Sequence, residues 1–454
     1  MDQRYTRLVQ QLQTGAIDRR NFIVRAFALG ISTSVIGSAL RAGSAAAQDA
    51  SPAAGGSIGN PDIEHITTTD KGVIRLYSSW PLTGTYELLG GDAVEAIKLA
   101  LADYGNAAGG YAIEYTALDD GIAANNGGWD PGAESANANT VIADPDAMVY
   151  MATYNSGAAK ISIPIMNEAG MAMISYANTY PGLSKPGYEE GEPDTYYPTG
   201  TRNYMRTVPA DDIQGAAGAK WAIESKGATK AYILHDQSLY GKGVAQVFND
   251  SFAELGGEVL GFEGYDPKAP DYQALMTKIA DAAPDILYVG ATVDNNAPKL
   301  MLDFRSLMPA DQVTFLGPDG LVNQAFIDGS GEAAQGAFVT FAGLPPSALK
   351  EMGGVGGDYV TRMEEIVGHS PDSYATYAYE TAVAVLQAID KAGTKDRAAI
   401  LEALMSTENF NSLLGGTWSF TETGDTDSLV MSVNEIVPND SGALEITFIE
   451  PIGA

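Results

Sequence analysis

Short apolar runs alternate with amphipathic helical segments along most of this 454-residue chain, and this alternation restricts its fold more than any other feature. One series of runs lies between residues 73 and 175, and the same rhythm restarts between residues 231 and 316. Strands that alternate with helices are typical of a parallel sheet with helices packed on its faces. Two series therefore predict an α/β protein with two doubly wound parallel-sheet lobes, and the length is sufficient for two domains.

The individual elements can be placed from the periodicity of their apolar residues. In the helix expected at 90–103, for example, Ala93, Ile97 and Leu101 recur at helical spacing. The segment 181–202 breaks the rhythm with Pro, Gly, Tyr and acidic residues, and is predicted to be an inserted loop. The expected strands are 73–77, 111–118, 148–151, 172–175, 231–234, 286–289 and 313–316, and the expected helices are 90–103, 135–143, 157–169, 242–255, 298–307 and 373–391.

Residues 1–47 are predicted to be a twin-arginine signal peptide and not part of the fold. Arg19-Arg20 resembles the twin-arginine consensus and precedes a moderately apolar stretch, 22–40, that is too weak for stable membrane insertion. Ala45-Ala46-Ala47 then offers a small-residue cleavage pattern. The alternative is an amphipathic N-terminal helix with a chance pair of arginines. Residues 48–72, rich in Ser, Gly, Ala, Pro and Thr, are predicted to be a mobile or loosely docked linker.

The composition excludes several classes of function. The chain has no cysteine, which removes disulfides, thiolate metal sites and cysteine nucleophiles. Its three histidines, His65, His235 and His369, are scattered and show no metal-ligand spacing, so neither a metal nor a cofactor is expected. With 26 Lys and Arg against 57 Asp and Glu, the formal net charge is −31, which argues against nucleic acid or anionic lipid as a partner.

The charge also suggests the conditions under which the protein works. The predicted signal peptide carries six arginines and two aspartates, so its removal would take the net charge from −31 to −35. So large a negative charge with few lysines predicts an acid-enriched, salt-adapted protein. An acidic surface of this kind is usually a solvated surface, and its partner need not be basic.

Ligands of open parallel sheets bind beyond the carboxyl ends of the strands, so the residues after each strand are the candidates for a site. Ser156 follows one expected strand and begins a helix, where free backbone N–H groups favour an anion. The polar turn 176–179 follows the next strand and could offer a second hydroxyl to the same anion. Asp319 follows a strand of the second series and could hold an ammonium group. Taken alone, both residues also fit a structural role, Ser156 as a helix cap and Asp319 in a Pro-Asp-Gly turn.

Signatures of catalysis are weak by comparison. No Gly-x-Ser-x-Gly sequence joins an expected strand to an expected helix, as a nucleophile elbow requires. Paired acids such as Asp119-Asp120 and Asp211-Asp212 arise by chance in a chain this acidic and fit solvated turns. The Gly241-x-Gly243 spacing after His235 completes no phosphate-binding motif. We therefore expect a binding protein and not an enzyme, with a hydrolase as the less favoured alternative.

A series of short motifs occurs in a fixed order between residues 73 and 450. They are Ser79-Trp80-Pro81-Leu82-Thr83-Gly84, Gly90-Gly91-Asp92-Ala93, Leu118-Asp119-Asp120, Tyr154-Asn155-Ser156-Gly157-Ala158, Ser175-Tyr176-Ala177-Asn178-Thr179, Arg206-Thr207 with Asp211-Asp212 and Gln214-Gly215, His235-Asp236 with Tyr240-Gly241-Lys242-Gly243, Gly317-Pro318-Asp319-Gly320, Gln335-Gly336, Tyr377-Ala378-Tyr379 and Thr417-Trp418-Ser419-Phe420. In this order the chain resembles the leucine/isoleucine/valine-binding protein family, the type I periplasmic binding proteins of branched-chain amino-acid ABC importers. Each motif is weak alone, and their order carries the resemblance.

This resemblance implies two α/β lobes joined by three crossovers, with the ligand between them as in a Venus flytrap. The crossovers are expected near Pro209, Phe341 and Gly424. The lobes would then be 73–210 with 342–424, and 211–341 with 425–454.

The resemblance also implies how the charged ends of a ligand are held. Ser156 and Thr179 correspond to the residues that hold an amino-acid carboxylate, with backbone support around Ala177. Asn178 lies beside them and is more polar than the small residue common at its position. Asp319 corresponds to the acid that holds the ammonium group.

Three aromatic residues complete the implied site. Tyr240 corresponds to an aromatic that stacks over the ligand, Tyr379 to a pocket-side tyrosine, and Trp80 to the loop that flanks the side-chain pocket. Two positions depart from the family pattern, because Thr292 and Leu89 stand where aromatic residues are common. These departures leave the charge clamps intact and affect the side-chain specificity.

The function implied is that of an exported, periplasmic or extracellular substrate-binding protein. It would bind a small molecule, by default a branched-chain amino acid or a similar small amide, and deliver it to the permease subunits of an ABC transporter. The family also contains binders of amides, urea and aromatic acids, so the branched-chain ligand is a default. The alternative is a ligand-sensing, receptor-type binding protein that feeds a signalling partner. The absence of a membrane-spanning apolar segment after residue 47 favours the importer.

Overall fold

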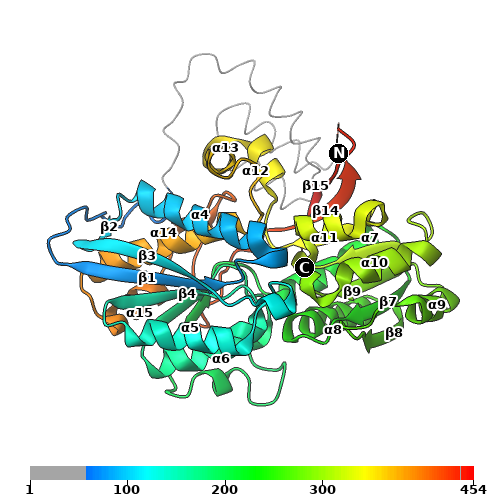
Figure 1. Cartoon of the computed structure of the whole chain (residues 1–454), viewed down its shortest axis with the longest axis horizontal. Helices are drawn as coiled ribbons and strands as arrows, with labels where there is room; N and C mark the ends of the chain where they lie inside the picture. The colour runs from blue at the N-terminus through cyan, green and yellow to red at the C-terminus, as the bar shows by residue number, and fades with distance from the viewer. Residues whose placement is uncertain (1–57, 440, 454) are drawn as a thin grey trace, which may run out of the picture.

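The computed structural model describes residues 58–439 and 441–453, so the predicted signal peptide at 1–47 lies outside the described residues. Within them, two large sheets lie side by side, each with helices packed on its faces (Figure 1), and β12 (Phe410–Asn411) and β13 (Thr417–Trp418) form a separate two-stranded sheet. This arrangement confirms the predicted fold class of two α/β lobes.

The sheet of lobe 1 is almost entirely parallel. Its strands, in spatial order, are β2 (Ala107–Ala108), β3 (Tyr111–Asp119), β1 (Val73–Trp80), β4 (Ala147–Ala152), β5 (Ala172–Ser175) and β6 (Tyr204–Arg206). Only the short β2 runs antiparallel, beside β3. The helices that pack in this lobe are α4 (Glu87–Asp103), α5 (Pro131–Ala143), α6 (Ser156–Glu168), α13 (Gly354–Val367), α14 (Ala375–Ala392) and α15 (Arg397–Met405).

The sheet of lobe 2 ends in an antiparallel hairpin. Its strands, in spatial order, are β15 (Leu444–Ile452), β14 (Met431–Pro438), β11 (Phe338–Phe341), β10 (Thr314–Gly317), β9 (Ile286–Gly290), β7 (Lys230–His235) and β8 (Glu258–Gly264). The five strands from β11 to β8 are parallel, and β14 and β15 are antiparallel to their neighbours. The helices of this lobe are α7 (Asp211–Glu224), α8 (Leu239–Glu254), α9 (Gln273–Ala282), α10 (Ala297–Leu307) and α11 (Gln324–Ser330).

Local chemistry explains where two of the helices, α5 and α8, begin. The α5 helix begins at Pro131, four residues before the predicted start, because Asp130 caps it and accepts hydrogen bonds from Gly132 N at 2.8 Å and Ala133 N at 3.0 Å. Ser238 caps α8 by accepting a hydrogen bond from Gly241 N at 2.9 Å. Fixed caps place the residues at these helix starts accurately beside the sheet edges.

Helix α7 was not predicted from its periodicity, and its packing explains why. Its buried side is formed largely by glycine and alanine, among them Gly215, Ala217 and Gly218. A Cβ at Gly215 would meet Val247 Cβ of α8 at 2.8 Å, so the two helices approach closely through small residues. Small residues produce no apolar stripe in the sequence.

The chain passes between the lobes three times. It goes from β6 to α7 through 207–210, returns after β11 through α12 (Pro346–Met352) and α13, and passes again after β13 (Thr417–Trp418) to reach β14. Gly424 lies on the last passage at φ +82°, and a Cβ there would meet Tyr204 O at 2.3 Å, so the crossover strands can approach only with glycine at this position.

Two segments predicted to be irregular are packed against lobe 1. In the expected linker, residues 58–72 lie along α14. Asn60 N donates to Gln387 Oε1 of that helix at 2.8 Å, and Ile66 N donates to Asp390 Oδ1 at 3.1 Å. The inserted loop 181–202 contains two short 3₁₀ turns, Pro181–Leu183 and Asp194–Tyr196, and encloses the buried Glu192. Both segments are therefore hydrogen-bonded parts of the lobe.

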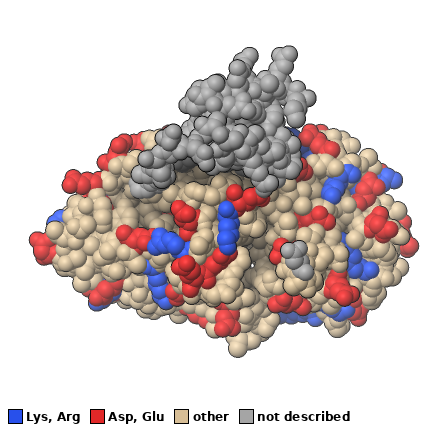
Figure 2. Space-filling model, turned by 90° about the horizontal axis from the view of Figure 1, so that it is seen from above, with Lys and Arg blue, Asp and Glu red and all other residues tan. Residues whose placement is uncertain are grey.

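The surface in Figure 2 carries acidic side chains over both lobes, with fewer basic side chains among them. Among the residues that the structure describes, no helix is long and apolar enough to cross a membrane.

Candidate ligand-binding site between the lobes

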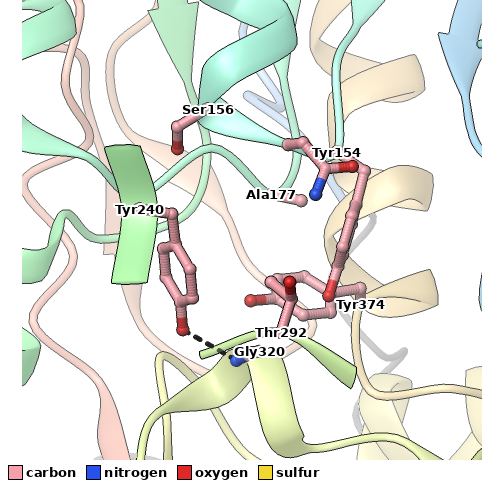
Figure 3. A pocket seen from close by; sticks show the side chains of 8 residues that line it. Tyr154, Ser156, Ala177, Tyr240, Thr292, Gly320 and Tyr374 are labelled. Carbon is pink, nitrogen blue, oxygen red and sulfur yellow. Dashed lines mark hydrogen bonds between the residues drawn. The ribbon is translucent and has the colours of Figure 1, made fainter. Parts of the chain in front are cut away.

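A small cavity of about 20 Å³ lies between the two lobes, at the carboxyl ends of their strands. Side chains from both lobes point toward one space, with Ser156 and Ala177 on one side and Thr292 and Gly320 on the other (Figure 3). Lobe 1 contributes Tyr154, Asn155, Ser156, Ala177 and Tyr374, and lobe 2 contributes Tyr240, Thr292 and Gly320. The cavity therefore follows the strand-end rule, by which ligands of open parallel sheets bind beyond the carboxyl ends of the strands, and it does so for both sheets.

Ser156 lies at the start of α6, which begins four residues after the end of β4. The sequence predicted it as the N-cap, but Asn155 occupies that position and Ser156 is the first helical residue. Its hydroxyl accepts a hydrogen bond from Tyr180 N at 3.3 Å. The positive end of the α6 dipole thus faces the cavity beside a hydroxyl, and both favour an anionic group.

Of the three predicted residues in the turn after β5, only Ala177 lines the cavity. Ser175 Oγ accepts hydrogen bonds from Ala177 N at 3.0 Å and Asn178 N at 2.8 Å, so these backbone donors are occupied within the turn. Asn178 is buried behind the lining and donates to Tyr154 O at 2.9 Å, while Thr179 O accepts from Asp211 N at 2.8 Å. Asn178 and Thr179 therefore hold the loops that shape the cavity.

Asp319 is buried at the lobe 2 side of the cavity, two residues after β10 ends. Tyr240 donates its hydroxyl hydrogen to Asp319 Oδ1 at 2.5 Å, and Tyr374 donates to Oδ2 at 2.5 Å. Gln214 Nε2 donates to Oδ1 at 2.9 Å from the interior of lobe 2. Because Tyr374 belongs to lobe 1, the Tyr374–Asp319 bond joins the two lobes.

Gln214 also connects Asp319 to a second buried acid, since its Nε2 donates to Asp211 Oδ1 at 2.8 Å. Burial raises the pKa of Asp211 well above its ordinary value, and the charge of Asp319 raises it further. Burial likewise raises the pKa of Asp319, although hydrogen bonds from Tyr240, Tyr374 and Gln214 oppose that rise. Two acids in one low-dielectric region favour a cationic group nearby.

Trp80 and Tyr379 do not line the cavity. Trp80 is fully buried and meets Tyr176 edge to face, with ring centroids 4.7 Å apart, so it lies in the layer behind the lining. The Tyr379 hydroxyl donates to Asp103 Oδ2 at 2.7 Å, and this contact fixes its side chain against α4. The tyrosine of this region that enters the cavity is Tyr374, at the N-cap of α14.

The sequence reasoning missed Tyr154 and Tyr374 as site residues. Tyr154 follows β4 within the motif that contains Ser156, so the strand-end rule could have identified it. Tyr374 precedes a helix whose next 16 residues are all buried, and no local signal separates it from the other tyrosines there.

A second contact closes the cavity beside Tyr154. Tyr86 lies 5.3 Å from Tyr154 between ring centroids, and its hydroxyl donates to Asp294 of lobe 2. Among the described residues, no group of three or more His, Asp or Glu side chains is arranged to hold a metal ion.

Comparison with known proteins gives consistent results. A family model described as "Periplasmic binding protein" matches residues 75–436. Leu/Ile/Val-binding protein homolog 2 of Brucella abortus (strain 2308) is 28% identical over 348 residues, which are 76% of this chain and 85% of that protein. The structure of a leucine-binding protein from Thermotoga maritima MSB8 gives a TM-score of 0.71 at 23% identity, covering 83% of this chain and 98% of that one. A solute-binding protein of an ABC transporter from Rhodopseudomonas palustris HaA2, in complex with p-hydroxybenzoic acid, gives 0.70 at 18% identity, covering 84% and 97%.

Proposed function

This chain belongs to the periplasmic binding protein family, as its resemblance to the leucine/isoleucine/valine-binding proteins predicted, and on that premise we propose that it is the substrate-binding component of an ABC importer that carries an amino acid. One observation carries the choice of ligand class. The cavity has an anion-favouring end at Ser156 and the start of α6 on lobe 1, and an acid, Asp319, behind its opposite side on lobe 2. A zwitterion fits between ends of opposite preference.

The lining of the cavity supports a small ligand with an apolar side chain. Its volume of about 20 Å³ holds roughly one water molecule, so the lobes must move apart to admit an amino acid. The rings of Tyr154, Tyr240 and Tyr374 offer an apolar surface for a side chain. A branched-chain amino acid is the default, since the Brucella relative is named for Leu, Ile and Val.

A second candidate is an aromatic carboxylate without an amine. Three tyrosine rings line the cavity, and both oxygens of Asp319 already accept hydrogen bonds from Tyr240 and Tyr374. The Rhodopseudomonas protein of similar fold is in complex with p-hydroxybenzoic acid. Such a ligand would use the Ser156 end and stack between the rings.

A thermal-shift screen distinguishes the two ligand classes. The probes are the twenty amino acids, short amides, benzoate and p-hydroxybenzoate, followed by calorimetric titration of each stabilising compound. A ligand at a hundred times its dissociation constant stabilises the folded state by roughly 2.7 kcal/mol. We expect aliphatic amino acids to give the largest shifts. Stabilisation by benzoates alone would replace the amino acid with the aromatic carboxylate, and no stabilisation by any probe would contradict both.

The proposal includes export and delivery to permease subunits. Arg19-Arg20 is the feature that supports twin-arginine export. Replacing both arginines with lysine should retain the precursor in the cytoplasm without changing the affinity of the purified protein for its ligand. Continued export of that variant would show that another route is used.

A further inference from the structure

The carboxylate of Asp319 reaches the cavity only through two phenol groups. Tyr240 and Tyr374 each donate to one of its oxygens at 2.5 Å, and Gln214 contacts it from the side away from the cavity. Tyr240, Tyr374 and Gly320 line the cavity, whereas Asp319 does not. A ligand group directed at this acid therefore meets the tyrosine hydroxyls first.

The direction of these hydrogen bonds determines what the phenols offer to a ligand. Burial raises the pKa of Tyr240 and Tyr374 well above the ordinary value, so both stay protonated and give their hydrogens to Asp319. Each phenol oxygen therefore presents lone pairs and no hydrogen to other partners. The Tyr240 oxygen accepts from Gly320 N at 2.8 Å, and none of the described residues donates to the Tyr374 oxygen.

We propose that the ligand ammonium group is bound by the hydroxyl oxygens of Tyr374 and Tyr240, with Asp319 as the acid behind them. This inference rests on the amino-acid function proposed above. An ammonium group has three hydrogens to donate and accepts none, so it complements two phenol oxygens whose own hydrogens point away. Hydrogen bonds in such a chain polarise one another, and the charge of Asp319 strengthens both phenols as acceptors.

The hydrogen bonds that would run from the ammonium group through Tyr374 and Tyr240 to Asp319 are here called the relay. The relay also links recognition of the amine to closure of the lobes. Tyr374 precedes α14 of lobe 1, while Tyr240 and Asp319 belong to lobe 2. The two oxygens can contact one ammonium group only when the lobes are together. Tyr374 is therefore assigned as a residue that favours ligands with an amine and that contacts this amine together with Tyr240 only when the lobes are closed.

The test compares each of two amino acids with the same molecule lacking its amine. The probes are L-leucine with 4-methylpentanoate, and L-phenylalanine with 3-phenylpropanoate, titrated calorimetrically into the wild-type protein and into Tyr374→Phe. We expect the variant to bind the preferred amino acid at least tenfold more weakly and the deaminated acid about as well as the wild type, since it loses one acceptor and keeps the ring.

The matched control is Tyr377→Phe. Tyr377 is a buried tyrosine of the same helix whose hydroxyl has no hydrogen-bond partner, so its replacement should leave both affinities unchanged. Circular dichroism and the melting temperature report whether either variant is folded.

The outcomes separate this inference from the function on which it rests. If Tyr374→Phe loses the preference for the amino acid over the deaminated acid while Tyr377→Phe keeps it, the result supports the relay. If the wild type prefers amino acids and Tyr374→Phe keeps that preference, the relay is overturned and the function stands. Tighter binding of an amino acid by Tyr374→Phe would also overturn it, because Tyr374 would then compete with the ligand for Asp319. If the wild type binds deaminated acids better, or binds no probe, the amino-acid function and the relay both fail.

Discussion

Arg206 and Asp425 are 219 residues apart in the chain, and they form a buried ion pair with Nε and Oδ1 2.6 Å apart. Arg206 is the last residue of β6, before the first crossover, and Asp425 lies on the third crossover. Arg206 also donates to Asn178 O at 3.1 Å and Tyr180 O at 2.8 Å, and Ser184 contacts both members of the pair. Two crossovers and the root of the inserted loop are thereby joined at one guanidinium group.

Arg206→Met should destabilise the protein strongly. It leaves Asp425 buried without its partner, and removing one member of a buried pair costs about 3–5 kcal/mol. Arg362→Met is the control. The ion pair between Arg362 and Asp103 is half-exposed, and such pairs contribute less than about 1 kcal/mol to the free energy of unfolding. Urea unfolding measures both, and equal stability of the two variants would show that the Arg206 pair is not essential to the junction.

Asp319→Asn should weaken binding of an amino-acid ligand by about thirtyfold or more. The shape of the side chain survives, but the negative charge behind Tyr240 and Tyr374 does not, and losing one charge of a buried pair costs roughly 2–5 kcal/mol. Asp328→Asn, an exposed acid of α11, is the control. Calorimetric titration decides the result. Unchanged affinity would reduce Asp319 to a turn residue, and stronger binding would indicate an anionic ligand without an amine.

Ser156→Ala should weaken binding of the amino acid less than Asp319→Asn does, by about 1–3 kcal/mol of binding free energy. The hydroxyl is lost, but the start of α6 still faces the ligand carboxylate. Ser162→Ala on the same helix is the control, since Ser162 is buried and donates to Ala158 O at 3.2 Å, away from the cavity. Equal affinities of the two variants, measured with the same amino acid, would remove Ser156 from the carboxylate site.

Glu380 should make the protein less stable as the pH rises. Burial raises its pKa from 4.5 to about 7, despite hydrogen bonds from Ser412 Oγ, Leu413 N and Trp418 Nε1. The folded state thus binds the proton more tightly than the unfolded chain. That stability is present at low pH and is lost as the pH rises from about 4.5 through 7.

Between pH 5 and pH 8, the wild type should lose about 2–3 kcal/mol more of its free energy of unfolding than Glu380→Gln. Glu402→Gln, an exposed residue of α15, is the control and should follow the wild type. Urea unfolding at several pH values provides the measurement. Parallel curves for wild type and Glu380→Gln would contradict the assignment.

The melting temperature should rise with monovalent salt if the acidic composition reflects adaptation to salt. The repulsion of the predicted −35 charge acts over about 10 Å at 0.1 M ionic strength and over about 3 Å at 1 M. Acidic side chains spread over both lobes are the source of that repulsion (Figure 2). A melting curve that stays flat from roughly 0.05 to 2 M NaCl, a range that spans long to short screening, would argue against the adaptation.

The elements that sequence reasoning located best are those with strong local signals. The strand at 172–175 has the predicted bounds, and the strand at 286–289 differs from β9 by one residue, because both are short buried apolar runs. Helix α7 and the β14–β15 hairpin were not predicted. The burial of α7 depends on close approach to α8 through small residues, and the position of β14 depends on pairing with the distant β11.

The site could be located from the sequence only in part. Ser156, Ala177 and Tyr240, which the sequence predicts to bind the ligand, line the cavity, since each follows the end of a parallel strand closely along the chain. Tyr379 was chosen in place of Tyr374. Five residues apart on a helix with 100° per residue, the two side chains point about 140° apart, so only one can face the cavity.

The sequence by itself determined the properties that are local: the alternation of strands and helices, the helix caps, and the polar residues after the strands. The tertiary structure decided which distant side chains meet. Tyr374 reaches Asp319 over 55 residues of sequence, and Arg206 reaches Asp425 over 219. Such contacts are set by how two lobes pack after the chain has crossed between them three times. No periodicity or motif within a short segment contains that information.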